Sequence, residues 1–286
     1  MEIRNLENTD FDTLFQGFER AFSDYDIHFE KSEVRAMLNR RGYTPRLSFA
    51  AFDEEDEIVA FTLNGVGTFN GISTAYDTGT GTVMEYRGKG LAKEIFNYSM
   101  PYLKSAGIEQ YLLEVLQNNE KAISVYRKLG FEITREFDCF RQCREVVASP
   151  VGDSQLLQIK ICPISIGQIL ELNGFWDFSP SWQNSMDSII RGSVGLECLG
   201  AILDGKIVGY CVFDPLTGDL SQIAVDRDFR RQKIGTRLLR EMITHTQSDI
   251  IKVLNIPPHC SSLAAFLNKN NIPLSGKQFE MILSFK

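Results

Sequence analysis

The chain has 286 residues, of which 43% are hydrophobic and 23% are charged. This composition is typical of a globular protein, and the length suits two domains of ordinary size. The net charge is −7 and the basic residues are scattered. No patch therefore offers the positive field that a phosphate backbone requires, and we expect no nucleic-acid partner.

Apolar windows of membrane-spanning length and metal-binding spacings are both missing from the sequence. The first residues also lack the apolar core of a signal peptide. The six cysteines stand far apart, without CxxC pairs or His-rich spacing. We therefore expect a cytoplasmic protein with no membrane partner, no metal ion and reduced cysteines.

The first half of the chain predicts an alternation of strands and helices. The expected elements are a strand at Glu2 to Arg4, helices at Asp10 to Phe22 and Ser32 to Arg41, and strands at Leu47 to Asp53, Ile58 to Thr68 and Ser73 to Met84. The first helix carries an apolar stripe that predicts core packing, formed by Phe11, Leu14, Phe15, Phe18 and Phe22. The acidic run from Asp53 to Glu57 predicts a solvated hairpin tip.

The next segment is the most informative of the chain. It reads Arg87-Gly88-Lys89-Gly90-Leu91-Ala92 and lies between a β-prone run and a helical pattern. A strand that turns through glycines into a helix leaves backbone N–H groups unpaired at the helix start, where the helix dipole also favours an anion. Such a turn is suited to hold a pyrophosphate, because glycines let the backbone approach it closely.

A second pattern follows about thirty residues later. Leu112 to Leu116 predicts a strand, and the helical spacing from Asn119 to Leu129 predicts a helix. Gly130 is a typical C-terminal stop for that helix. A new strand is expected from Phe131 to Phe140.

Together these two motifs resemble those of the GCN5-related N-acetyltransferase (GNAT) family. The acetyl-CoA loop of that family reads Gln/Arg-x-x-Gly-x-Gly/Ala, and Arg87, Gly90 and Ala92 match it. The later family segment reads Asn-x-x-Ala-x-x-x-Tyr-x-x-x-Gly-Phe, and it is matched by Asn119, Ala122, Tyr126, Gly130 and Phe131. The order of the two motifs and the elements that carry them also agree with the family.

The second half repeats the plan of the first. After a linker of Pro/Gly/Ser character, the expected elements are a strand at Leu156 to Ile161, a helical stretch at Ile164 to Leu172, strands at Cys198 to Leu203, Lys206 to Phe213 and Leu220 to Val225, and a helix at Thr236 to Ile243. Asp204-Gly205 predicts a hairpin turn. The segment from Arg230 to Gly235 aligns with the loop at Arg87, which indicates an internal repeat of domain size.

We therefore predict an α/β (α+β) protein with two tandem GNAT-like domains, each a mixed, mostly antiparallel twisted sheet with helices on both faces. The boundaries are residues 1–144 for an N-terminal catalytic domain, 145–155 for the linker and 156–286 for a C-terminal GNAT-like domain. In the C-terminal domain Lys233 stands opposite Gly90, Leu267 opposite Tyr126 and Cys260 opposite Asn119. Leucine cannot donate a proton, so we expect this copy to be degenerate. Whether it binds a nucleotide stays open.

Acetyl transfer to an amine requires a polarised thioester carbonyl, an uncharged amine and a proton for the departing thiolate. The resemblance implies acetyl-CoA as cosubstrate, with backbone N–H groups around Val83 and Glu85 polarising the carbonyl. It assigns pyrophosphate binding to Arg87, Gly88, Lys89, Gly90, Leu91 and Ala92. Asn119 would contact the cofactor arm or cap its helix. By the same resemblance Tyr126 protonates the sulfur. For the base, Glu114, Asp77 and no dedicated base all stay open.

The acceptor is expected to be a primary amine of a small molecule or peptide. The family would line its pocket with the connection between the first two helices, here Ser23 to Phe29. Asp24, Tyr25 and Asp26 suit a cationic amine, and a solvated polar turn is the other interpretation. In the second copy both tryptophans fall within Asn173 to Asn184, which suits a binding wall, a domain contact or local packing. A non-catalytic acyl-CoA-binding regulatory or scaffold protein is the alternative function.

Overall fold

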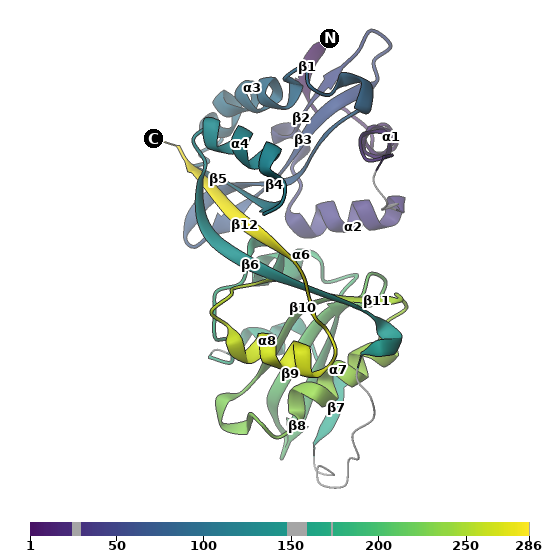
Figure 1. Ribbon diagram of the computed structural model, residues 1–286, viewed down its shortest axis with the longest axis vertical. Helices are drawn as coiled ribbons and strands as arrows, with labels where there is room; N and C mark the ends of the chain where they lie inside the picture. The colour runs from purple at the N-terminus through teal and green to yellow at the C-terminus, as the bar shows by residue number, and fades with distance from the viewer. Residues whose placement is uncertain (25–29, 148–158, 173, 286) are drawn as a thin grey trace. The chain divides into compact units, whose positions relative to one another are not determined.

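The computed structural model describes residues 1–24, 30–147, 159–172 and 174–285. The chain divides into two compact units, one formed by Met1–Thr134 with Glu280–Lys286 and the other by Arg135–Phe279. The first unit therefore ends ten residues before the predicted boundary at residue 144, and it gains the last seven residues. Most of the predicted linker lies outside the described residues. Each unit combines a mixed sheet with helices, as the predicted fold class requires (Figure 1).

The first unit follows the predicted element order closely. Its elements are β1 (Glu2–Asn5), α1 (Phe11–Ala21), α2 (Lys31–Arg41), β2 (Phe49–Phe52), β3 (Ile58–Phe69), β4 (Ile72–Thr82), α3 (Leu91–Ser105), β5 (Gln110–Leu116), α4 (Glu120–Lys128) and the start of β6 (Glu132–Cys143), with short 3-10 turns at η1 (Pro45–Leu47) and η2 (Met84–Tyr86). The strands run in the order β1-β2-β3-β4-β5, followed by the end of β12 (Leu274–Ser284). Strands β1 to β4 pair antiparallel, and β4 and β5 pair parallel.

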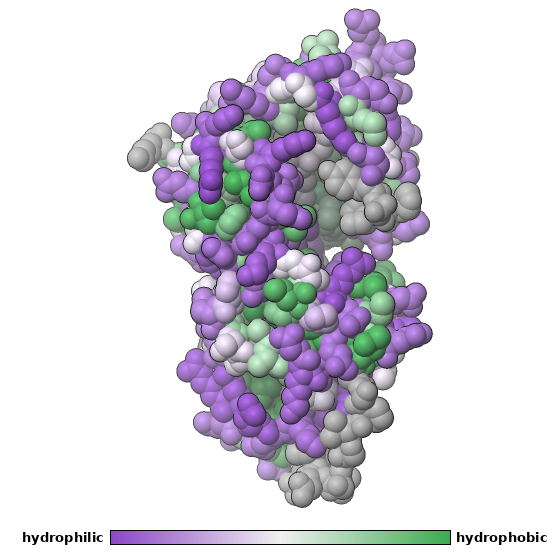
Figure 2. All heavy atoms as spheres, in the orientation of Figure 1, coloured by the Kyte–Doolittle hydropathy of each residue, from purple (hydrophilic) through white to green (hydrophobic). Residues whose placement is uncertain are grey.

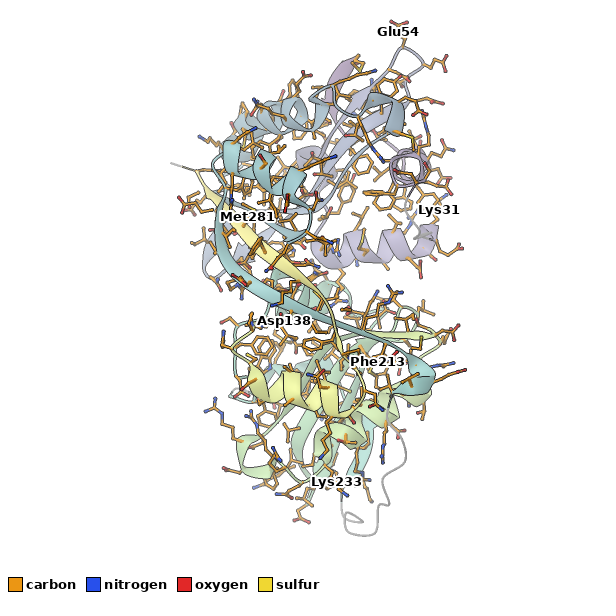
Figure 3. The ribbon with its side chains drawn as sticks, in the orientation of Figure 1. Lys31, Glu54, Asp138, Phe213, Lys233 and Met281 are labelled. Atoms are coloured by element: carbon orange, nitrogen blue, oxygen red, sulfur yellow. The ribbon has the colours of Figure 1, made fainter. Side chains whose placement is uncertain are left out.

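Helices cover both faces of this sheet (Figure 1). The α1 stripe packs where it was predicted, with Leu14 and Phe18 buried against Phe61 of β3 and with α2 on the same side. On the other face Ile95 of α3 packs against Phe49. Asp10 fixes the start of α1, because its carboxylate accepts the N–H groups of residues 12 and 13 at 2.8 Å. The acidic hairpin tip is exposed, and Figure 3 shows Glu54 pointing away from the unit.

The second unit repeats this architecture. Its elements are the end of β6, η3 (Arg144–Val146), β7 (Lys160–Pro163), α5 (Ile166–Leu170), η4 (Trp182–Asn184), α6 (Met186–Arg191), β8 (Glu197–Leu203), β9 (Lys206–Asp214), β10 (Asp219–Val225), η5 (Arg227–Phe229), α7 (Ile234–His245), β11 (Ile250–Ile256), α8 (Ser261–Lys269) and the start of β12. The strands run in the order β6-β11-β10-β9-β8-β7. Only β10 and β11 pair parallel. The predicted turn joins β8 to β9, and both of its residues, Asp204 and Gly205, have positive φ angles.

Two clusters form the core of the second unit, one on each face of the sheet. Phe213, labelled in Figure 3, is fully buried in the cluster that contains Leu238 of α7 and Leu267 of α8. Ile169 of α5 and Ile189 of α6 pack on the other face. In Figure 2 the visible surface is mostly hydrophilic, with smaller hydrophobic areas. No helix of the described chain is both long and apolar enough to cross a membrane.

Candidate active site

The two parallel strands of the first unit separate at their C-terminal ends. Pairing between β4 and β5 stops at Tyr76 and Leu112, although β4 continues to Thr82 and β5 to Leu116. Strand ends that part in this way leave backbone groups and side chains facing a shared opening. The predicted catalytic residues Asp77 and Glu114 both lie just beyond the point of separation.

A β-bulge places Asp77 at this point. Opposite β3, Asn64 pairs with Asp77 and Leu63 pairs with Gly79, so Thr78 is the extra residue. The Asp77 carboxylate accepts the Gly79 N–H and the Thr80 hydroxyl, each at 2.9 Å. Burial raises the pKa of Asp77 to about 6 despite these hydrogen bonds and the nearby Arg41 guanidinium.

Tyr126 and Glu114 belong to the same neighbourhood. Burial is the main cause that raises the pKa of Tyr126 well above its usual value, and the Asp77 carboxylate adds to the shift. The Tyr126 hydroxyl has no hydrogen-bond partner within the described ranges. Glu114 accepts the Tyr76 hydroxyl at 3.3 Å, and both Glu114 and Asp77 raise the pKa of Tyr76 further after burial. The fold thus brings the three predicted catalytic residues together.

The predicted loop supplies backbone donors beside the helix start. Gly88 and Gly90 have φ angles of 77° and 85°, and a Cβ at either position would meet open space. The first helical bonds are those of the Lys93 and Glu94 N–H groups to the Gly90 carbonyl. Among the described residues, the five preceding N–H groups, from Gly88 to Ala92, have no acceptor. Lys89 lies over the Tyr86 ring with its ammonium 4.7 Å from the ring centroid.

Arg87, predicted to contact the pyrophosphate, is held by contacts within the chain. Its two terminal nitrogens bind the Asp24 carboxylate at 2.6 and 2.7 Å, and its Nε donates to the Thr82 carbonyl at 3.0 Å. It also donates to the Ala21 carbonyl at 2.9 Å, and its own N–H bonds the Met84 carbonyl. The side chain therefore clamps the loop to the end of α1, and Arg87 lowers the pKa of Asp24.

Three further sequence-based expectations can be compared with the structure. The Asp24 carboxylate is held in the clamp, whereas Tyr25 and Asp26 lie outside the described residues. The Val83 N–H donates to the Val59 carbonyl at 2.9 Å, so it is committed to the sheet. Asn119 caps α4, because its side-chain oxygen accepts the Ala122 N–H at 3.2 Å. Val83 and Glu85, with Lys89, line a hollow of about 570 Å³ beside α1.

The second unit repeats the clamp, again between an arginine and an aspartate. It also repeats the loop, with larger side chains in place of the two glycines. Arg230 donates to the Asp177 carboxylate at 2.8 Å, to the Val225 carbonyl at 3.0 Å and to the Phe175 carbonyl at 3.1 Å. Arg231 and Lys233 have φ angles of 64° and 61°, so they adopt the left-handed conformation of Gly88 and Gly90. Sequence reasoning missed both clamps, although a signal existed: an aspartate follows the first helical stretch in each copy.

The predicted alignment of α8 with α4 also holds in the structure. Cys260 precedes α8 as Asn119 precedes α4, with φ and ψ angles of −81° and 57° against −86° and 64°. Asn271 takes the positive φ of Gly130. Leu267 occupies the position of Tyr126 and is fully buried. The second unit therefore keeps the backbone of the site and lacks its phenol.

Comparison with known proteins identifies the family. The profile of the acetyltransferase (GNAT) family matches residues 4–131 and residues 168–259. These two regions make up more than half of the chain. The chain therefore belongs to the GNAT family, with one match in each unit, as the two sequence motifs and the repeat predicted.

Relatives and solved structures agree with this assignment. The chain is 32% identical to N-alpha-acetyltransferase 30 of Schizosaccharomyces pombe over 30% of its own length and 58% of that protein. It is 28% identical to the N-acetyltransferase YobR of Bacillus subtilis over 29% of its length and 32% of that protein. It thus spans about half of the first relative and a third of the second.

The fold of the whole chain has solved counterparts at low sequence identity. A tandem GNAT protein from the clavulanic acid biosynthesis pathway matches with a TM-score of 0.71 at 13% identity, over 99% of this chain and 98% of that one. A GCN5-related N-acetyltransferase from Sphaerobacter thermophilus matches with a TM-score of 0.69 at 11% identity, over 99% and 95%. At these identities the likeness extends to the tandem fold alone.

Proposed function

We propose that this chain is an acetyl-CoA-dependent N-acetyltransferase whose first unit carries the reaction. The observation that supports this most directly is the juxtaposition of Asp77 and Tyr126 at the separation of β4 and β5, in the unit whose loop keeps both glycines. In the second unit the phenol is replaced by Leu267, which leaves that unit without a proton donor at the equivalent position.

The residues of the first unit fit a CoA thioester. Five backbone N–H groups without acceptors among the described residues, from Gly88 to Ala92, offer donors to a pyrophosphate. The absence of a Cβ at Gly88 and Gly90 leaves room for close approach. Lys89 adds a positive charge at the same place. When bound, acetyl-CoA would supply the activated acetyl group.

We infer that Asp77 rather than Glu114 is the base, because its pKa is raised and the Glu114 carboxylate already accepts the Tyr76 hydroxyl. With a pKa of about 6, its carboxylate is mostly ionised at neutral pH and still has appreciable proton affinity, which suits a general base. Asp77 would take a proton from the acceptor ammonium, so that the amine nitrogen can attack the thioester carbonyl carbon. Glu114, whose carboxylate already accepts the Tyr76 hydroxyl, would help to position the acceptor in the opening between β4 and β5.

Tyr126 is the proposed proton donor to the leaving sulfur. Its raised pKa keeps the phenol protonated throughout the neutral range. As the bond between carbon and sulfur breaks, the hydroxyl would donate to the thiolate that forms. The proposed acceptor is a primary amine of a small molecule or a peptide.

The test is the rate of CoA release in the presence of a panel of primary amines, measured for wild type and Tyr126→Phe. We expect Tyr126→Phe to lower kcat by roughly 10²-fold, in the range typical of general-acid catalysis, with unchanged affinity for acetyl-CoA. Tyr102→Phe is the matched control, because Tyr102 is an exposed tyrosine of α3 and its substitution should leave the rate of CoA release unchanged. Binding of acetyl-CoA without release of CoA from any amine would favour the scaffold alternative, and equal turnover in Tyr126→Phe would remove the proposed acid.

A further inference from the structure

Strand β1 forms an open edge of the first unit's sheet (Figure 1). Among the described residues its only strand partner is β2, with Glu2 opposite Phe52 at one end of the pairing. The edge strand of the second unit, β7, contains Pro163, which lacks the N–H that a further strand would bond. β1 contains no proline. Its backbone can therefore pair with a strand of another chain.

The alternation of the backbone decides which groups of β1 face outward. The Leu6 N–H donates to the Ser48 carbonyl at 3.0 Å, so Leu6 turns its backbone groups toward β2. In an antiparallel pair every second residue does so, which leaves the backbone groups of Ile3 and Asn5 facing outward. The N–H groups of these two residues have no acceptor in the described part of the chain.

A second copy of this chain fits the edge in one register. Two copies of β1 related by a two-fold axis run antiparallel, and residues with outward-facing backbone groups must then lie opposite each other. Two such pairings keep most of the strand, one centred on Ile3 and one on Arg4. Centring on Arg4 places two guanidinium groups opposite each other, which destabilises the pair. Centring on Ile3 places Glu2 of each copy opposite Arg4 of the other, so two attractive pairs form.

The two charged side chains of β1 are accessible and already ordered. Those of Glu2 and Arg4 are 69% and 37% exposed. The Arg4 guanidinium lies 3.6 Å from the centroid of the Phe52 ring and donates to Asp56 at 2.5 Å, so its position is fixed before a partner arrives. It also donates to Glu2 of its own chain at 3.1 Å. A guanidinium has five N–H donors, which suffice for the carboxylate of a second copy as well.

The other face of the edge carries exposed aromatic side chains. Ile3 alternates with the charged residues and packs on this face against the cluster that contains Phe49. Phe49 contacts Tyr98 and Tyr102 of α3, whose ring centroids lie 5.8 and 5.1 Å from its own. These two tyrosines are 40% and 44% exposed. A second copy at the edge would cover part of this surface, and its burial would add to the two attractive pairs.

We propose that two copies of this chain associate through their β1 strands, with Ile3 opposite Ile3 and Glu2 opposite Arg4. The backbone groups of Ile3 exchange two hydrogen bonds across the two-fold axis, and the sheets of the two first units become continuous. The paired strands are short, so the dimer is a weak one. This inference concerns the edge of the first unit and does not rest on the proposed reaction.

Charge reversal in the full-length chain tests this register, with sedimentation velocity over a range of protein concentrations as the measurement. Arg4→Glu leaves four carboxylates at the paired strands, and Glu2→Arg leaves four guanidinium groups. We expect each variant alone to associate roughly 10-fold more weakly than wild type, because two attractive pairs become repulsive. An equimolar mixture of the two variants should associate as tightly as wild type, and so should the exchanged chain Glu2→Arg/Arg4→Glu.

Glu7→Arg is the matched control, because Glu7 is exposed just beyond β1 and the substitution changes the net charge as much as Glu2→Arg does. It should leave association unchanged. A wild type that sediments as a monomer at every concentration would overturn the proposal. Association that neither reversal weakens would also overturn it, since the contact would then lie on another surface. The same holds for association that both reversals weaken and the mixture does not restore, in variants with unchanged urea unfolding.

Discussion

Asp77 shows how the burial of one carboxylate can cost stability at neutral pH. Its pKa is raised by burial from 3.8 to about 6, which means that the folded protein binds the proton more tightly than the unfolded chain does. The associated stability is fully present below about pH 4 and is lost as the pH rises through about 6. A shift of this size corresponds to about 3 kcal/mol.

The Asp77→Asn variant carries no such titration. We therefore expect its free energy of unfolding, relative to wild type, to rise by about 2.4 kcal/mol between pH 4 and pH 8, as measured by urea denaturation. The same substitution should abolish the increase of wild-type kcat/KM with pH through about 6. A stability difference that is the same at both pH values would contradict the raised pKa.

At this scale the sequence predicted which residues lie close together better than it predicted their contacts. Tyr126, Asp77 and Glu114 were predicted from motifs and strand positions, and the fold brings them together. The clamp between Arg87 and Asp24 was missed because the two residues are 63 positions apart, and the only signal was the aspartate that follows the first helical stretch in each copy. The raised pKa of Asp77 could not be predicted either, since it depends on burial produced by the bulge in β4.

At the scale of elements, the loop before α3 and the loop before α7 share the same left-handed backbone conformation, although only the first has glycines at the two positions. Arg231 and Lys233 keep positive φ angles at a cost of roughly 1 kcal/mol or more each. Element types and order could be predicted from periodicity and from Gly/Asp turns. The bulge in β4 could not, because an extra residue in a strand leaves no clear mark on an alternating pattern.

Gly65 of β3 shows where glycine is needed for close approach. A Cβ there would lie 2.1 Å from the backbone oxygen of Arg41, at the end of α2. Because backbone cannot move aside cheaply, we expect Gly65→Ala to destabilise the first unit by more than about 2 kcal/mol in urea unfolding followed by circular dichroism. Gly79→Ala is the control, since its Cβ would lie 3.9 Å from the Phe18 ring. Equal stability of the two variants would contradict this packing.

At the scale of the whole molecule, the chain does not divide into units at a single point. The final residues, Glu280–Lys286, belong to the first unit, while the start of β12 belongs to the second. Within the first unit Thr134 donates to the Glu280 carboxylate at 2.8 Å, and the Phe285 N–H donates to the Glu109 carbonyl at 2.7 Å. The predicted repeat was right, but its boundaries were not foreseeable, because a returning strand is a long-range pairing.

Deletion of residues 280–286 tests this arrangement. We expect the truncated chain to lose stability in the first unit and to bind acetyl-CoA more weakly, because β5 keeps β4 but loses the end of β12 on its other side. The tryptophan transition, which reports on the second unit, should change less than the circular dichroism transition of the whole chain. Unchanged acetyl-CoA affinity after the deletion would show that these residues are dispensable for the first unit.

The central claim is that the first unit holds the acetyl-CoA site, and the most direct test is calorimetric titration with acetyl-CoA. Lys89 and Gln232 occupy equivalent positions in the two loops, so Lys89→Glu and Gln232→Glu place a carboxylate at the same point of each. We predict one acetyl-CoA per chain in wild type, lost in Lys89→Glu and retained in Gln232→Glu. Loss in Gln232→Glu alone, or no binding to wild type, would contradict the assignment.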